Sequence, residues 1–155
     1  MKEKSKKCLS VIAIFISVVM VFVCLPDNVA EAKPSGTIVY ELWGDSTSTF
    51  VRKSGKLTVK TSYPMKTYKF KDGELGEKLD RNPKKISYRL AKNCKWNQYY
   101  VGDKDPSSEI TYKDLRKRIN DEYKTAQKYG EYDSPTRIWI LVRNNRIIEV
   151  MAINS

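Results

Sequence analysis

The chain has 155 residues, with 29 Lys and Arg against 18 Asp and Glu, a formal net charge of +11, and no histidine. This length fits one domain with a short appendage. Without histidine the chain cannot form a Ser-His-Asp triad, a Cys-His pair, a His-ligated zinc site or an imidazole pH switch. The excess of positive charge directs attention to anionic partners.

Residues 1–32 have the features of a cleaved secretory signal peptide. Lysines at the N-terminus precede the uncharged stretch Cys8–Leu25, Pro26 ends that stretch, and Ala30 and Ala32 are the small residues that signal peptidase requires. We expect cleavage after Ala32, with an uncleaved membrane anchor as the alternative. The mature protein is then secreted and stays extracellular or associated with the cell envelope, in the style of a Gram-positive bacterium.

Residues 33–155 are expected to form a single small α+β domain that keeps most of the charge. Removal of the signal takes away four basic and three acidic residues, so the formal net charge of the domain is +10. Cys94 is then the one remaining cysteine, and the flanking Lys92 and Lys95 could lower its thiol pKa. Because no histidine can act as its general base, we expect a buried structural thiol, with intermolecular disulfide pairing as the alternative.

The first half of the domain is rich in strand signals. Alternating apolar residues and turn residues predict short strands over residues 37–43, 50–53, 56–61, 66–71 and 85–91. Ser54-Gly55 marks a hairpin turn between two of these strands. We expect residues 74–83 to be an acidic-leaning loop and Lys95–Val101 to be an aromatic loop.

A helix and a hairpin follow in the second half. Thr111 is a typical N-cap with Asp114 three residues later, and Gly130 is a typical C-terminal stop, which predicts one amphipathic helix between them. The final hairpin, over residues 137–143 and 146–153, turns at Asn144-Asn145. In the register of a two-residue turn, Arg143 faces Arg146, Val142 faces Ile147, Leu141 faces Ile148, and Trp139 faces Val150.

These elements predict an α+β fold. We expect a bent antiparallel sheet of about six or seven strands, with one amphipathic helix before a C-terminal β-hairpin. The element order is similar to that of an oligonucleotide/oligosaccharide-binding (OB) barrel, which also has a helix before its last two strands. An OB-like small barrel is therefore the alternative architecture.

A basic sheet face is the candidate functional site. Strand alternation directs the apolar residues of the middle strands to the core and seven basic residues to the other side. These candidate anion-binding residues are Lys53, Lys56, Lys60, Lys69, Lys71, Lys85 and Arg89. If the strands are neighbours, the residues form one surface, which is either a solvated face or a site for an anionic polymer such as a teichoic acid, an acidic glycan or a nucleic acid.

The most consistent hypothesis is a secreted, non-catalytic binding module that associates with anionic polymers. Like charges face each other across two predicted turns, Lys53 against Lys56 and Arg143 against Arg146, and a bound anion would relieve their repulsion. The alternatives are a protein-interaction or inhibitor module that uses the aromatic loop or the helix face, and a small hydrolase. The sequence assigns no catalytic residue, cofactor or metal ion.

Overall fold

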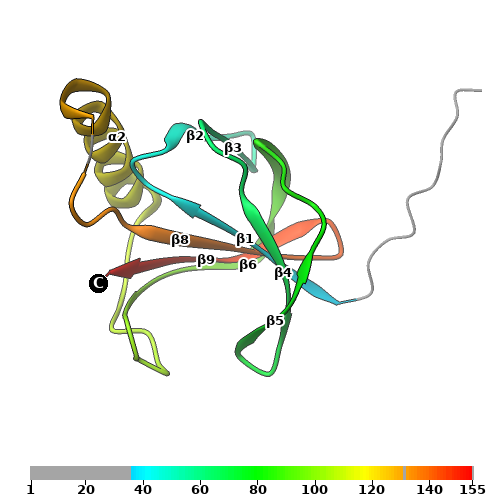
Figure 1. The fold of residues 1–155 in the computed structure, drawn as a ribbon. Helices are drawn as coiled ribbons and strands as arrows, with labels where there is room; N and C mark the ends of the chain where they lie inside the picture. Colours follow the sequence, from blue (N-terminus) through cyan, green and yellow to red (C-terminus); the bar gives the residue numbers. More distant parts are fainter. Residues whose placement is uncertain (1–35, 131, 155) are drawn as a thin grey trace, which may run out of the picture. The chain divides into compact units, whose positions relative to one another are not determined.

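The computed structural model describes residues 36–130 and 132–154 (Figure 1), so the predicted signal peptide and its cleavage site lie outside the described residues. The described residues belong to one compact unit. None of the helices within these ranges has both the length and the apolar character needed to cross a membrane.

The described chain contains nine strands and one helix. In chain order they are β1 (Thr37–Trp43), β2 (Thr47–Lys53), β3 (Lys56–Thr61), β4 (Lys66–Lys71), β5 (Glu74–Leu79), β6 (Lys85–Tyr100), β7 (Ser108–Glu109), α2 (Tyr112–Tyr129), β8 (Arg137–Arg143) and β9 (Arg146–Asn154). The α+β class is therefore confirmed, but the expected six or seven strands are too few. Two of the additional strands are β5, which forms where a loop was expected, and the short β7.

The nine strands form one mixed sheet in the order β2-β3-β6-β9-β8-β1-β4-β5, with β7 paired to β6. The β6–β9 pairing is parallel, whereas the other pairings are antiparallel. The expectation of an antiparallel sheet is therefore wrong at its centre. A parallel pair needs a long crossover, and here the crossover contains α2.

The segment Lys95–Val101, expected to be an aromatic loop, is almost entirely strand. Its residues Lys95 to Tyr100 are the second half of the long strand β6 and pair with Glu149 to Asn154 of β9. In this strand Trp96, Gln98 and Tyr100 lie on one side and Lys95, Asn97 and Tyr99 on the other, so each side carries both polar and aromatic residues. The pairing partner lies about fifty residues further along the chain, so no local pattern indicated it.

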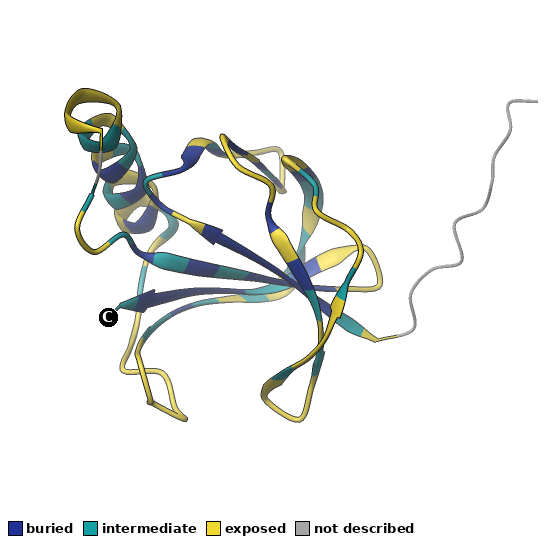
Figure 2. Ribbon diagram, viewed as in Figure 1, coloured by how far each residue is buried: buried dark blue, intermediate teal, exposed yellow. Residues whose placement is uncertain are grey.

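The sheet curls around its inner side, where most of the apolar core lies (Figure 2). Leu115 and Ile119 of α2 are fully buried in this core. The hydroxyl groups of Tyr40 on β1 and Tyr88 on β6 are 2.7 Å apart, although β8 and β9 lie between these strands in the sheet. A contact of this kind requires a strongly bent sheet, as the sequence predicts.

The predicted helix caps are confirmed. Thr111 Oγ1 accepts a hydrogen bond from the backbone N–H of Asp114, and Gly130 adopts φ = +86° while its N–H donates to the carbonyl of Ala126. Glu122 is buried on the same helix and accepts hydrogen bonds from the N–H and the hydroxyl of Thr136, at 3.0 and 2.7 Å. This Glu122–Thr136 clamp ties α2 to the start of β8.

The final hairpin turns where expected but changes register further along. Asn144 and Asn145 have φ = +51° and +58°, the left-handed values of a tight two-residue turn, and Arg143 pairs with Arg146. The register then shifts by one residue at a β-bulge. As a result Leu141 faces Glu149 rather than Ile148, and Trp139 faces Met151 rather than Val150.

Candidate functional site: a basic surface on the outer side of the sheet

Five of the seven predicted basic residues lie together on the side of the sheet that faces away from the core. Their strands β2, β3 and β6 are neighbours, and the register pairs Lys53 with Lys56, Lys56 with Arg89, and Lys60 with Lys85. All five side chains are exposed. Each β3 residue is paired to both of its neighbours, so the five side chains point to the same side.

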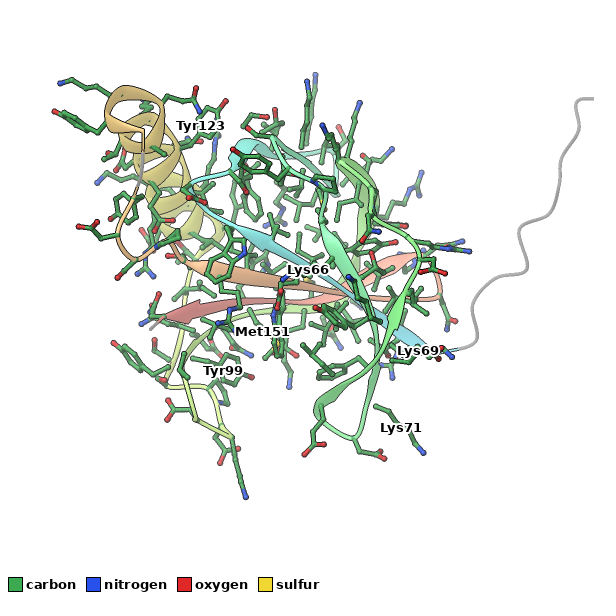
Figure 3. The ribbon with its side chains drawn as sticks, viewed as in Figure 1. Lys66, Lys69, Lys71, Tyr99, Tyr123 and Met151 are labelled. Carbon is green, nitrogen blue, oxygen red and sulfur yellow. The ribbon has the colours of Figure 1, made fainter. Side chains whose placement is uncertain are left out.

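Lys69 and Lys71 do not belong to this group. Both extend from β4 (Figure 3), which is separated from β6 by β9, β8 and β1. Phe70 is on the outer side because the register links it through Thr37 to Arg143, so the two lysines next to Phe70 are on the opposite side. The prediction of one seven-residue surface is wrong here, because it assumed that β4 lies beside β3 and β6.

The ion pairs also separate Lys69 and Lys71 from the other five residues. Lys69 Nζ lies 2.6 Å from Glu77 Oε2, and Lys71 Nζ lies 3.9 Å from Asp72 Oδ2. In the part of the chain that the structure describes, no carboxylate forms an ion pair with any of the five grouped residues. The charges of the five are therefore available to a partner outside the domain.

Two arginines that were not among the candidates extend the surface. The parallel pairing of β6 with β9 sets Arg146 beside Arg89, and the hairpin sets Arg143 beside Arg146. The result is a row of five basic residues across five adjacent strands, which we call the basic row. It consists, in order across the sheet, of Lys53, Lys56, Arg89, Arg146 and Arg143.

The sequence predicts that Arg143 and Arg146 face each other across the turn. It does not predict that this pair lies beside Arg89. Arg143 and Arg146 are more than fifty residues from Arg89 in the chain. Together with Lys60 and Lys85, the basic row forms what we call the basic surface. Neighbouring strands are about 4.8 Å apart, so consecutive charges in the row repel one another at short range in the free protein.

The surface between the charges is small and polar rather than aromatic. Thr58 on β3 pairs with Ser87 on β6, and their hydroxyl oxygens are 2.6 Å apart. Val51 on β2, the next residue in that row, is 38% exposed. Among the described residues, no aromatic side chain shares these rows of β2, β3 and β6. On these three strands the surface therefore offers positive charge and hydroxyl groups, but no ring on which a base could stack.

Cys94 is not activated as a nucleophile. Its thiol is half-buried between the two halves of β6, and desolvation raises the pKa of Cys94 to about 11, an effect that Glu149 increases and Arg52 opposes. Lys92 and Lys95 therefore do not produce the lowered pKa that a reactive cysteine requires. The half-buried thiol agrees with the structural role expected from the sequence.

Comparisons of the chain with models of known protein families, with curated proteins and with solved structures find no match.

Proposed function

We propose that the domain is an OB-like barrel that binds an anionic polymer on the basic surface. In an OB barrel the first strand is long and pairs with strands two and four, strand three pairs in parallel with strand five, and a helix separates strands three and four. Here β1 and β2 are consecutive and act as the two halves of the first strand: β1 pairs with β8, and β2 pairs with β3. The β6–β9 pairing is parallel, and α2 lies between β6 and β8.

The remaining strands fit this scheme as an addition to the barrel. The β4–β5 hairpin follows β3 and continues the sheet beyond β1. OB barrels bind oligonucleotides and oligosaccharides on the face of strands two and three and on the loops between strands one and two and between strands four and five. Under this correspondence the binding face is that of β3 and β6, and the two loops are Ser54-Gly55 and Asn144-Asn145.

The basic row supports this proposal most strongly, because it coincides with that binding face. Lys53 and Lys56 flank the first loop, Arg143 and Arg146 flank the second, and Arg89 lies between the two pairs. Five unpaired, exposed cations at regular spacing destabilise the free surface and are neutralised by a chain with repeated negative charges.

The absence of aromatic side chains from the basic surface on β2, β3 and β6 favours one class of polymer. Single strands of nucleic acid bind to OB folds largely by stacking bases on aromatic rings. The basic surface instead offers cations and the Thr58 and Ser87 hydroxyl groups. We therefore propose a polyol-phosphate polymer of the teichoic acid type, which an exported envelope protein would meet.

The test compares two triple variants that remove the same number of charges. In the row variant Lys56, Arg89 and Arg146 are each replaced by Gln, and in the control variant the ion-paired Lys69, Lys71 and Lys117 are replaced by Gln. Binding to poly(glycerol phosphate), heparin and oligo(dT) is measured across a series of salt concentrations. We expect the row variant to bind poly(glycerol phosphate) about a hundredfold more weakly at 0.1 M salt, with a reduced salt dependence.

The control variant should lose no more than about threefold, because its lysines lie outside the surface and only the net charge changes. Equal losses in the two variants would contradict a local site. Binding that ignores salt would contradict polyanion recognition. Tighter binding of oligo(dT) than of the other two polymers at equal charge would identify nucleic acid as the partner instead.

A further inference from the structure

A second site on the outer side of the sheet is built around Arg137, away from the basic row. Two cavities of about 560 and 690 Å³ meet at this side chain, and both are also lined by Val101 and Ile153. On β8, Arg137 lies six residues before Arg143, so roughly 20 Å of strand separates it from the basic row. This site can therefore bind a ligand other than the polymer proposed above.

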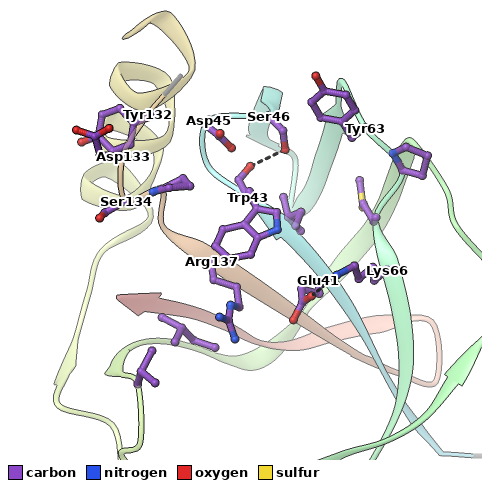
Figure 4. A pocket seen from close by; sticks show the side chains of 16 residues that line it. Glu41, Trp43, Asp45, Ser46, Tyr63, Lys66, Tyr132, Asp133, Ser134 and Arg137 are labelled. Atoms are coloured by element: carbon purple, nitrogen blue, oxygen red, sulfur yellow. Dashed lines mark hydrogen bonds and ion pairs between the residues drawn. The ribbon is translucent and has the colours of Figure 1, made fainter. Parts of the chain in front are cut away.

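Arg137 is a half-buried cation in a cavity that Glu41, Asp45 and Asp133 also line, but it forms an ion pair with none of them. Its guanidinium lies 5.1 Å from the centre of the Trp43 ring (Figure 4), and its Nε is buried with no hydrogen-bond partner. Within residues 36–130 and 132–154, no carboxylate forms an ion pair with Arg137. A partly desolvated guanidinium that contacts an aromatic ring but forms no ion pair can still pair with a carboxylate, which it matches in shape and charge.

The larger cavity extends from Arg137 along an aromatic floor. Trp139 follows two residues later on β8 and faces Met151 of β9, and Phe70 and Tyr99 line the same cavity. Aromatic faces of this kind pack against the apolar C–H faces of sugar rings. The floor therefore suits a ligand with a sugar ring at least as well as it suits one with an aliphatic chain.

Glu149 supplies a hydrogen-bond acceptor in this cavity. Its Oε1 accepts a hydrogen bond from Asn97 Nδ2 at 2.7 Å and one from the Tyr99 hydroxyl at 3.3 Å, which hold the carboxylate in place. Glu149 lies opposite Leu141, about 13 Å along the strands from Arg137. A ligand that contacts both residues needs an anionic group at one end, a hydroxyl donor at the other and the length of two sugar rings.

The charges at the mouth of the cavity limit the ligand further. Asp72, Glu74 and Asp103 line it, against one lysine, Lys104. This acidic rim disfavours a polymer with many negative charges and tolerates a molecule that carries a single carboxylate. The site therefore differs in specificity from the basic surface.

We propose that this cavity binds a disaccharide that carries one carboxylate, of the uronic acid type. The carboxylate pairs with the guanidinium of Arg137, the rings lie on Trp139 and Tyr99, and a hydroxyl group donates to Glu149. The basic surface takes no part in this binding.

The experiment uses two probes, cellobiouronic acid and cellobiose, which differ only in a carboxylate or a hydroxymethyl group at one C6. Binding is measured by ligand-observed NMR and by tryptophan fluorescence for the wild type, Arg137→Gln, Arg137→Lys and the control Arg143→Gln. We expect the wild type to bind the acid roughly ten- to a hundredfold more tightly than cellobiose, and Arg137→Gln to lose that preference. Arg137→Lys should keep part of it, because lysine keeps the charge but not the planar fork.

Arg143→Gln should leave the preference unchanged, and Arg137→Gln should still bind poly(glycerol phosphate), so failure of this proposal is distinguishable from failure of the polymer site. If Arg137→Gln does not fold, Glu149→Gln replaces it and should weaken both probes by a similar factor. No binding of either probe, equal binding of both by the wild type, or loss of the preference in Arg143→Gln would overturn the proposal.

Discussion

The basic surface and the Arg137 cavity present positive charge on the same side of one sheet, yet they differ in almost every other respect. The basic row consists of exposed side chains with no carboxylate partner among the described residues. Arg137 is a single half-buried cation between two cavities, beside Trp43 and an acidic rim. Many exposed charges favour affinity for any polyanion, whereas one desolvated charge in a shaped cavity favours selection among small ligands.

The long strand β6 contributes to both regions. Its first half holds Lys85 and Arg89, and its second half holds Asn97 and Tyr99 beside Glu149. The register with β9 shifts between Leu90 and Lys95, and Cys94 lies within that irregular segment. The two regions can therefore be perturbed separately, from either side of this shift.

The largest effect is expected from Gly44→Ala, which should damage the cavity side alone. A Cβ at Gly44 would overlap with Glu122 Oε2, and so it would break the Glu122–Thr136 clamp just before Arg137. We expect a loss of about 2 to 4 kcal/mol in the free energy of unfolding, measured with urea. In Gly76→Ala, the matched control, the nearest atom to the new Cβ is the Lys69 carbonyl oxygen at 3.3 Å, so a much smaller loss is expected.

Polymer binding by the folded Gly44→Ala protein should persist, because the basic row lies at the other end of β8. Loss of polymer binding at a denaturant concentration where the variant is still folded would show that the two regions depend on each other.

The second-largest difference between the two regions is expected in how strongly salt weakens ligand binding. For five contacts to a polyanion, binding should weaken roughly a hundredfold to fivehundredfold between 50 and 200 mM salt. Binding of one carboxylate by Arg137 should weaken by less than about threefold, since a partly buried pair is screened less. Calorimetric titrations at four salt concentrations give the salt dependence of the binding constant for each site. Equal salt dependences would contradict the difference between the two sites.

The thiol of Cys94 should report on the segment between the two regions. With a pKa of about 11, against 9.0 for the ordinary thiol, it should react with iodoacetamide about a hundredfold more slowly in the folded protein than in urea at the same pH. The rate is measured by mass spectrometry. Equal rates in the folded and unfolded states would mean that the segment around Cys94 opens readily. The basic surface and the Arg137 cavity would then not be held in a fixed arrangement.

The smallest effect is expected from the pH dependence of the Glu122–Thr136 clamp. Burial raises the pKa of Glu122 above its ordinary value of 4.5, while Thr136 and Arg118 oppose the shift. Because the folded-state pKa is the higher one, the contribution of the carboxyl group to stability is present at low pH and is lost as the pH rises through the folded pKa.

Wild-type stability relative to Glu122→Gln should therefore be greater at pH 4 than at pH 7, measured by urea unfolding at both values. Polymer binding should not follow this pH dependence, because Glu122 is remote from the basic row. If wild-type stability relative to Glu122→Gln is instead greater at pH 7, the hydrogen bonds from Thr136 outweigh the burial of the carboxyl group.

Much of the local structure could be predicted from residue patterns. The caps of α2, the turns at Ser54-Gly55 and Asn144-Asn145, and the facing pairs Lys53–Lys56 and Arg143–Arg146 were all expected. Each depends on residues a few positions apart, whose backbone preferences act without the rest of the chain. The bulge at Ile148 was not predictable in this way, because Ile148 continues the alternation of a regular strand.

The candidate site was predictable only in part, for the same reason. Strand alternation correctly grouped Lys53, Lys56, Lys60, Lys85 and Arg89, whose strands are neighbours. Lys69 and Lys71 have the same local pattern but lie on a strand beyond β1, on the other side of the sheet. Alternation gives the side of a strand that a residue occupies relative to its own neighbours, but not which strand lies beside it.

The sequence by itself determined that this is a basic, histidine-free chain whose turns, helix caps and strand alternation direct lysine and arginine outward. The tertiary structure alone decided which of those cations meet. The parallel pairing of β6 with β9 joins Arg89 to Arg146 and so completes the basic row, and the curvature of the sheet and its loops encloses Arg137 between two cavities. Both depend on contacts between residues far apart in the chain, which cooperative packing selects and no local preference encodes.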